Sequence, residues 1–326
     1  MKTVSWLRCG AVALLAAGVL APPQANAEVP PRFYWKSLAG ANAVPVIFQS
    51  MSGNTNPFDP AQTVYGDASF EGTLTLAGYA KTFALFDRSA LAAVIVPMGR
   101  LSGDLVVGDN AVSPSASGFG DPMFEFNINL LGPPAQKSLQ DVLRYEPGFS
   151  LDLIVDLAVP IGEYDEDQPL NIGQNRWYGR LGFPVVWQLG AWVPGRRTTL
   201  EFMPVVWLFG DNDDYFAGGT LETDPLFELE ARLTRDFTEH FWGSLDAAWY
   251  TGAEATINGV KGEKLDNLGL GFTLGYQIND NLGLTFGYKS TVNDSAPTDL
   301  QMDVFQISVV YGWHPIIEGA KRLSKE

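Results

Sequence analysis

Polar and apolar positions alternate with a period of two along most of the chain. Between residues 149 and 159 every odd position is apolar, whereas Asp152 and Asp156 occupy even positions. The same alternation recurs at residues 227–233, 282–289 and 305–313. Because successive side chains of a strand point to opposite faces of a sheet, this pattern predicts β-strands with one apolar face and one polar face.

The pattern predicts about twelve strands, and Pro45, which weakens the first of them, leaves a margin of two. Most span roughly ten to fourteen residues, enough for a tilted strand to cross a bilayer. The predicted strands are residues 43–50, 70–85, 90–101, 118–131, 148–160, 177–189, 198–209, 224–234, 241–252, 265–277, 282–292 and 302–313.

Long and short connections alternate between these strands. The one exception, residues 132–147, is long where a short turn is expected. The spacing of Leu139, Val142 and Leu143 behind two prolines predicts a small helix there. Long loops at one end and tight turns at the other are typical of outer-membrane barrels with both termini in the periplasm. We therefore predict an all-β fold, an antiparallel up-and-down transmembrane β-barrel of the outer-membrane type.

A secreted β-sandwich or jelly roll also produces alternating strands and is the main competing fold. The regular alternation of loop lengths and the export signal described below favour the barrel. So do aromatic residues near strand ends, which stand where a membrane barrel has its interfacial girdles. These residues are Trp177, Trp187, Tyr250, Tyr276, Tyr288, Tyr311 and Trp313.

The first 27 residues have the features of a signal peptide. Lys2 and Arg8 make a positive start, an apolar run follows over residues 11–21, and residues 25–27 (Ala-Asn-Ala) match a cleavage site. We expect a signal peptide at 1–27, a barrel domain at 28–313 and a periplasmic C-terminal tail at 314–326. Within the barrel domain, residues 28–42 are a lead-in that either folds into the lumen as a constriction or stays in the periplasm.

Composition and charge argue against several classes of protein. Asp and Glu number 37 against 21 Lys and Arg, a net charge of −16, whereas a nucleic-acid binder needs a basic surface. One Cys and two His leave no basis for a metal centre built from these residues. No motif calls for a cofactor.

Catalysis has weak support in the sequence. A Ser-His-acid site needs a histidine beside its nucleophile. His240 falls in a predicted turn and His314 follows the last predicted strand, so both are expected to be solvated. Acidic residues are too numerous for any pair to indicate glycoside hydrolysis. We therefore expect no catalytic residues and no enzyme.

Acidic clusters occur in two predicted loops, at residues 165–167 and 211–214. The second lacks the glycine and the distal glutamate of an EF-hand. Two interpretations remain open: solvated loops, or carboxylates that bridge lipopolysaccharide phosphates through divalent cations.

The interior face is the best candidate for a functional site. Charges inside a narrow barrel are costly unless they are paired or hydrated, so they either line a water-filled path that prefers neutral or cationic solutes, or form a paired plug. By strand parity the candidate residues are Asp121, Glu125, Asp152, Asp156, Arg180, Glu201, Glu228, Glu230, Arg232, Asp246 and Lys289. We expect Arg180, Arg232 and Lys289 to pair with the acids.

Several short motifs resemble the "MetA-pathway of phenol degradation" family of outer-membrane proteins. They are residues 118–122 (Gly-Phe-Gly-Asp-Pro), 160–164 (Pro-Ile-Gly-Glu-Tyr) and 171–175 (Asn-Ile-Gly-Gln-Asn), with Ile161 where that pattern has threonine. The strand–turn–strand at 276–284 resembles that of many outer-membrane proteins. The resemblance implies an outer-membrane barrel that transports small molecules, often linked with the degradation of aromatic compounds.

The sequence and this resemblance together predict a channel in the outer membrane for passive uptake of small molecules, hydrophobic or aromatic ones among them. The expected partners are outer-membrane lipid and lipopolysaccharide, the barrel assembly machinery and a small-molecule substrate. The alternative is a structural or adhesive barrel with a filled lumen that transports nothing.

Overall fold

The computed structural model describes residues 30–65, 68–107, 110–294, 296 and 298–323. The predicted signal peptide lies outside the described residues. Within the described residues, no helix is both long enough and apolar enough to span a membrane.

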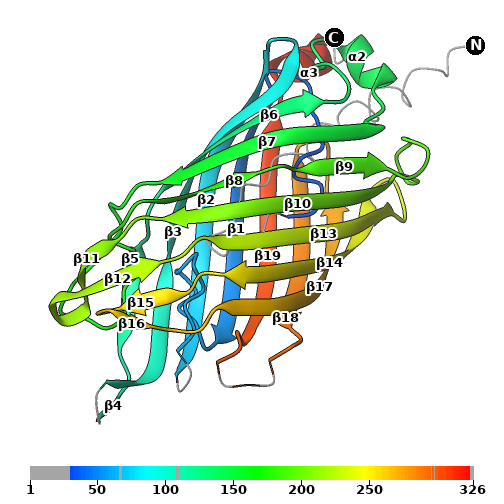
Figure 1. The fold of residues 1–326 in the computed structure, drawn as a ribbon. Coiled ribbons are helices and arrows are strands. Elements are labelled where there is room, and N and C mark those ends of the chain that lie inside the picture. Colours follow the sequence, from blue (N-terminus) through cyan, green and yellow to red (C-terminus); the bar gives the residue numbers. More distant parts are fainter. Residues whose placement is uncertain (1–29, 66–67, 108–109, 295, 297, 324–326) are drawn as a thin grey trace, which may run out of the picture.

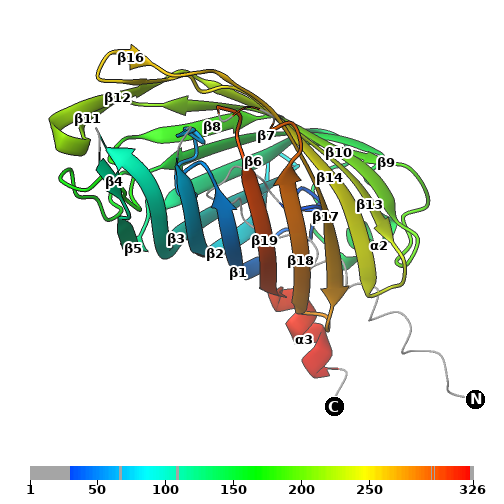
Figure 2. The same ribbon diagram turned by 90° about the horizontal axis from the view of Figure 1, so that it is seen from below.

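The fold is a closed barrel of twelve antiparallel strands, which confirms the predicted fold class and strand number (Figures 1 and 2). Each wall strand pairs with its neighbours in sequence, and β1 closes the barrel by pairing with β19. The wall consists of β1 (Asn42–Gly53), β2 (Ser69–Leu85), β3 (Arg88–Val107), β5 (Ser115–Phe119) with β6 (Met123–Leu131), β7 (Phe149–Ala158), β8 (Tyr178–Gly182) with β9 (Val185–Gln188), β10 (Thr198–Phe209), β13 (Leu226–Asp236), β14 (Phe241–Gly252), β17 (Leu265–Gln277), β18 (Leu282–Thr291) and β19 (Met302–Trp313).

The alternation seen in the sequence corresponds to the two faces of the wall. In β7, Phe149, Val155 and Leu157 are exposed on the outside, whereas Asp152 and Asp156 are buried inside. A closed barrel satisfies the backbone hydrogen bonds between strands, and its apolar outer face suits the hydrocarbon core of a bilayer. One predicted girdle residue is wrong: Tyr250 is only 1% exposed and lies inside the barrel.

Two predicted continuous strands are broken in the wall. Residues 120–122 separate β5 from β6, although both pair with β3. Phe183 and Pro184 separate β8 from β9, although both pair with β7 and β10. Pro122 and Pro184 have no N–H to donate to a neighbouring strand, which explains why the ladders are interrupted there.

The two ends of the barrel differ. The long connections gather at one end, called the outer end below, where β4 (Asn110–Val112) pairs with the end of β3 and a small sheet forms. That sheet contains β11 (Asn212–Tyr215), β12 (Gly219–Thr223), β15 (Ala255–Ile257) and β16 (Val260–Lys261), and the 3-10 helix η1 (Phe216–Gly218) joins its first two strands. These additions lie within predicted loops, and their strands are too short for periodicity to reveal.

Two helices lie at the opposite, inner end (Figure 1). α2 (Leu139–Arg144) is the helix predicted from residues 139–143, but it begins at the N-cap Ser138 rather than at the proline pair. Hydrogen bonds from the Lys137 N–H and the Ser138 cap lower the pKa of Asp141, which keeps the capping carboxylate ionised.

The second helix, α3 (Pro315–Leu323), follows β19 where the sequence predicted only a tail. The expectation that His314 is solvated is wrong, because this residue is 3% exposed. Its Nε2 lies 3.0 Å from the Ala39 carbonyl oxygen, and its Nδ1 accepts a hydrogen bond from the Ile316 N–H. His240 is exposed in a turn.

Candidate functional site in the barrel interior

The structure places ten of the eleven predicted site residues on the interior face of the wall. Asp246 and Lys289 are half-buried, and the others are almost fully buried: Glu125, Asp152, Asp156, Arg180, Glu201, Glu228, Glu230 and Arg232. They come from β6, β7, β8, β10, β13, β14 and β18, so the charges surround the lumen.

The N-terminal segment, residues 30–41, folds into the lumen at the inner end. Of the two alternatives left open by the sequence, the constriction is therefore the observed one. Phe33, Tyr34 and Trp35 are buried there. The Arg32 backbone N–H and the Trp35 indole N–H donate to the two carboxylate oxygens of Glu201, at 2.9 and 2.8 Å. The Lys36 ammonium pairs with Asp152.

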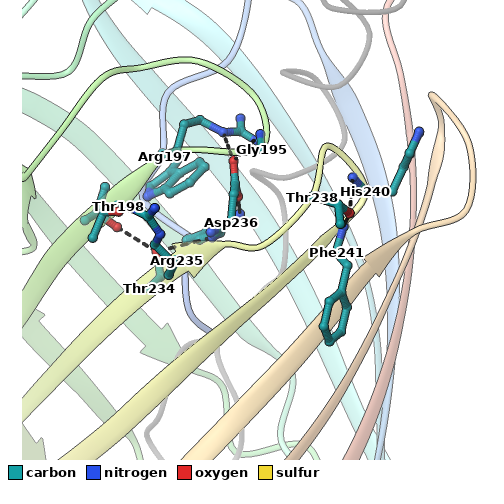
Figure 3. A network of polar contacts seen from close by, with 12 residues as sticks. Gly195, Arg197, Thr198, Thr234, Arg235, Asp236, Thr238, His240 and Phe241 are labelled. Carbon is teal, nitrogen blue, oxygen red and sulfur yellow. Dashed lines mark hydrogen bonds and ion pairs between the residues drawn. The ribbon is translucent and has the colours of Figure 1, made fainter.

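Asp236 is the main anchor of this segment. One of its oxygens accepts from Arg32 Nη1 at 2.7 Å. The other accepts from Arg197 Nε at 2.7 Å and from the Gly195 N–H at 3.1 Å, and Figure 3 shows these two partners around Asp236. The Arg32 guanidinium also lies over the Trp35 ring, 4.3 Å from its centroid. Removal of this carboxylate would leave two buried guanidinium groups without their ion-pair partner, which is strongly unfavourable.

Sequence reasoning missed these anchoring residues. Asp236 falls in a predicted turn, Arg32 and Lys36 precede the first predicted strand, and Arg197 lies just before the predicted strand at 198–209. One feature of the sequence could have indicated the buried N-terminal segment. Basic and aromatic side chains stand next to one another there, among proline and small residues, and this combination is unusual for a solvated linker.

A second group of charges spans the middle of the lumen. Glu125, Asp156 and Arg180 occupy facing positions on three adjacent strands, and Arg180 forms an ion pair with Asp156. Both oxygens of Glu125 lack a hydrogen-bond partner among the described residues. One guanidinium therefore faces two buried carboxyl groups, and of these only Asp156 forms an ion pair with it.

The remaining interior charges have local partners. Arg232 pairs with Glu230, and the Trp207 indole N–H donates to Glu228 at 3.1 Å. The Thr273 hydroxyl donates to Asp246 at 2.7 Å, and the Lys289 ammonium donates to the Tyr250 hydroxyl oxygen at 2.5 Å. Arg180 and Arg232 thus pair with acids as predicted from the sequence, whereas the contact described for Lys289 is a tyrosine.

Residues 54–65 fold inward from the outer end, where the sequence predicted only a long loop. Asp59 organises a turn in this segment by accepting from the N–H groups of Ala61 and Thr63, both at 3.0 Å. Arg176 lies 3.4 Å from the same carboxylate. Ala61 and Gln62 are fully buried as a result, so the outer mouth is narrowed by the chain itself.

Asp121, the eleventh predicted residue, is buried at the break between β5 and β6. Its two oxygens accept from the N–H groups of Gly162 and Gln174, both at 2.8 Å. A Cβ on Gly162 would lie 2.7 Å from the carbonyl carbon of Gly120. A Cβ on Gly173 would lie 2.8 Å from the carbonyl carbon of Gly162. The three family-like motifs therefore converge on one close-packed wall contact.

The acidic loops at the outer end are held by protein contacts. Asp165 accepts from the Asp167 N–H and the Gln168 amide, at 3.0 and 3.1 Å. Burial raises the pKa of Tyr215, which keeps its hydroxyl protonated beside that of Tyr65, 2.9 Å away. Among the described residues, no three His, Cys, Asp or Glu side chains are arranged to hold a metal ion.

The closed wall with an apolar outside and a charged inside defines a transmembrane β-barrel of the outer-membrane type. The family model described as "Putative MetA-pathway of phenol degradation" matches residues 51–307. The chain belongs to that family, which confirms the resemblance seen in the sequence.

Among solved structures, the chain is similar to the COG4313 outer membrane channel from Pseudomonas putida F1, with a TM-score of 0.72 and 19% identity. The match covers 88% of this chain and 100% of that one, and it establishes a shared fold. The β domain of the Bordetella autotransporter BrkA gives a TM-score of 0.47 at 9% identity, over 83% and 99% of the two chains. A FadL homologue from Pseudomonas aeruginosa gives 0.42 at 12%, over 93% and 97%. Scores this low support no inference. No curated protein matches the chain.

Proposed function

We propose that this protein is an outer-membrane channel for passive uptake of small molecules and not an enzyme. The proposal rests on one observation, that both constrictions are formed by chain segments inside the lumen and not by the wall. They are built from residues 30–41 and 54–65, which enter the lumen from its ends, while the wall itself is a complete barrel. A conductive state therefore requires displacement of chain segments and no rearrangement of the wall.

The charges of the interior support a preference for neutral and cationic solutes. The group of Glu125, Asp156 and Arg180 places two carboxyl groups and one guanidinium in the middle of the lumen, and carboxyl groups that are ionised in a water-filled path repel anions. The proposed substrates are small hydrophobic or aromatic molecules. This class is supported by the family description, which names a pathway of phenol degradation.

The proposed location is the outer membrane, reached by means of a signal peptide at 1–27, with 28–313 as the barrel domain and 314–326 on the periplasmic side. The apolar outer face would contact lipid, and the outer loops would contact lipopolysaccharide. β19, with its alternating aromatic and aliphatic residues, would serve as the signal for the barrel assembly machinery.

A second function, a structural barrel that transports nothing, is favoured by the number of buried ion pairs in the lumen. Conductance of the purified protein in planar lipid bilayers separates the two. The channel proposal predicts discrete current steps that favour K⁺ over Cl⁻. A folded protein that inserts and stays silent over a wide voltage range would support the structural barrel instead.

A further inference from the structure

The outer end contains a cavity of about 460 Å³ that lies between the inward-folded segment 54–65 and the β15–β16 hairpin. Its floor is formed by buried residues, among them Thr63, Ala253 and Leu265. Its rim is formed by exposed ones, among them Val260. The rim of the cavity therefore faces the outside of the cell if the long loops are extracellular, and its floor lies against the inward-folded segment.

The walls of this cavity are mainly apolar. Val64, Ala253, Ala255, Ile257 and Leu265 all line it. The charged side chains near it stand at the exposed rim, where Lys261 Nζ lies 2.5 Å from Glu254 Oε1. Binding of an ionised group in the depth of this cavity would require its desolvation without a charge partner, which is unfavourable.

The floor of the cavity is the same turn that narrows the lumen. Thr63 and Val64 line the cavity, and Thr63 donates its N–H to Asp59, which Arg176 holds in turn. Gln62, at the centre of the turn, has a φ of 54°, a left-handed conformation that is costly for a residue with a side chain. A ligand in the cavity would thus lie directly against the part of the chain that must move for the mouth to open.

We infer that this cavity is an outer loading site for small, uncharged, mainly apolar molecules, which enter the lumen past the turn at residues 59–63. The inference rests on the proposed channel function and specifies its substrate class. A volume of about 460 Å³ lies within the range of pockets that enclose small organic ligands, and such pockets are predominantly apolar.

The site can be mapped with an uncharged aryl diazirine, 3-phenyl-3-(trifluoromethyl)diazirine, which inserts into neighbouring residues on illumination. The full-length mature protein is labelled in lipid nanodiscs, and the labelled peptides are identified by mass spectrometry. We expect labelling of residues 62–64 and 253–265, in addition to the lipid-facing strands that any apolar probe reaches.

Ala255→Trp fills the cavity and is expected to reduce labelling at residues 62–64 about tenfold, equivalent to about 1.4 kcal/mol of binding free energy. Val260→Asp places a charge at the exposed rim without changing the buried packing, so it tests the site even if Ala255→Trp folds poorly. The matched control is Ala111→Trp, an equally large substitution at an exposed position of β4. Labelling confined to the lipid-facing strands would overturn the inference.

Bilayer conductance measured on the same variants separates this inference from the channel proposal. Conductance without cavity labelling would contradict the loading site and leave the channel intact. Cavity labelling in a protein that conducts nothing would support a binding site and refute the channel. Loss of labelling in both cavity variants, with conductance retained, is the result that supports both.

Discussion

Arg32 and Asp236 lie 204 positions apart in the chain and form an ion pair of 2.7 Å inside the barrel. Asp236 also binds Arg197, so one carboxylate fastens the N-terminal segment and is shared by two guanidinium groups. If this carboxylate lost its charge, both guanidinium groups would lack their main partner and the segment would lose its strongest anchor. A substitution of Asp236 therefore tests directly whether this ion pair holds the inner constriction in place.

Asp236→Asn should destabilise the inner constriction. Breaking a buried ion pair by removing one partner typically costs about 3–5 kcal/mol, and here the substitution leaves Arg32 and Arg197 uncompensated. We expect faster proteolysis of residues 30–41 and more frequent channel openings, measured by limited proteolysis and bilayer recordings. Glu239→Gln is the control, because it removes an exposed carboxylate from the adjacent turn. Equal behaviour of the two variants would refute the anchoring role of Asp236.

Deletion of residues 30–38 should raise the conductance of each open channel. These residues occupy the lumen, while the pairing of β1 with β2 and β19 begins at Asn42, so the wall should still close. A synthetic peptide of residues 28–41, added to the deletion protein, should restore the block, and a peptide of scrambled order should not. Unchanged conductance in a folded deletion protein would show that the segment does not limit the path.

Glu125→Gln should weaken the preference of the channel for cations. The substitution keeps the shape of the side chain and removes one of the two carboxyl groups that face Arg180, so the open, water-filled lumen carries one ionisable acid fewer. The reversal potential under a KCl gradient should shift toward zero. Glu71→Gln, at an exposed position of β2, should leave it unchanged. A shift of equal size in both variants would mean that Glu125 lies off the path.

Gly162→Ala should destabilise the barrel wall. The added Cβ would lie 2.7 Å from the Gly120 backbone, and overpacking of this kind typically costs about 1–3 kcal/mol. Gly190→Ala is the matched control, because a Cβ there would meet no atom within 4 Å. The temperature at which the folded band disappears on SDS gels should fall only for Gly162→Ala. A similar temperature for both variants would contradict the close packing of the three motifs.

Strand periodicity was sufficient to predict the wall. The alternation around Asp152 and Asp156 follows directly from the two faces of a strand in a barrel, and it requires no knowledge of long-range contacts. The interior position of Glu201 and Glu228 follows by the same parity. Tyr250 shows where this reasoning failed: it was assigned to a girdle from its place near a strand end, although parity puts it beside Asp246 on the interior face.

The constrictions could not be predicted in the same way. Residues 30–41 and 54–65 have no repeating pattern, and their positions depend on single contacts such as Arg32 with Asp236 and Asp59 with Arg176. Parity also did not reveal that the predicted strand containing Asp121 is interrupted at residues 120–122. Periodicity describes regular backbone, and the segments that fold into this barrel are those in which the backbone is irregular.

The most direct test of the account is the uptake of a radiolabelled aromatic compound at low concentration. It should be measured in cells that lack this protein and in cells to which the gene has been restored, with the protein verified in the outer membrane. The account predicts faster uptake on restoration, and a further increase with Asp236→Asn. Equal uptake in all strains, for aromatic, sugar and fatty-acid probes alike, would contradict it and leave a filled structural barrel.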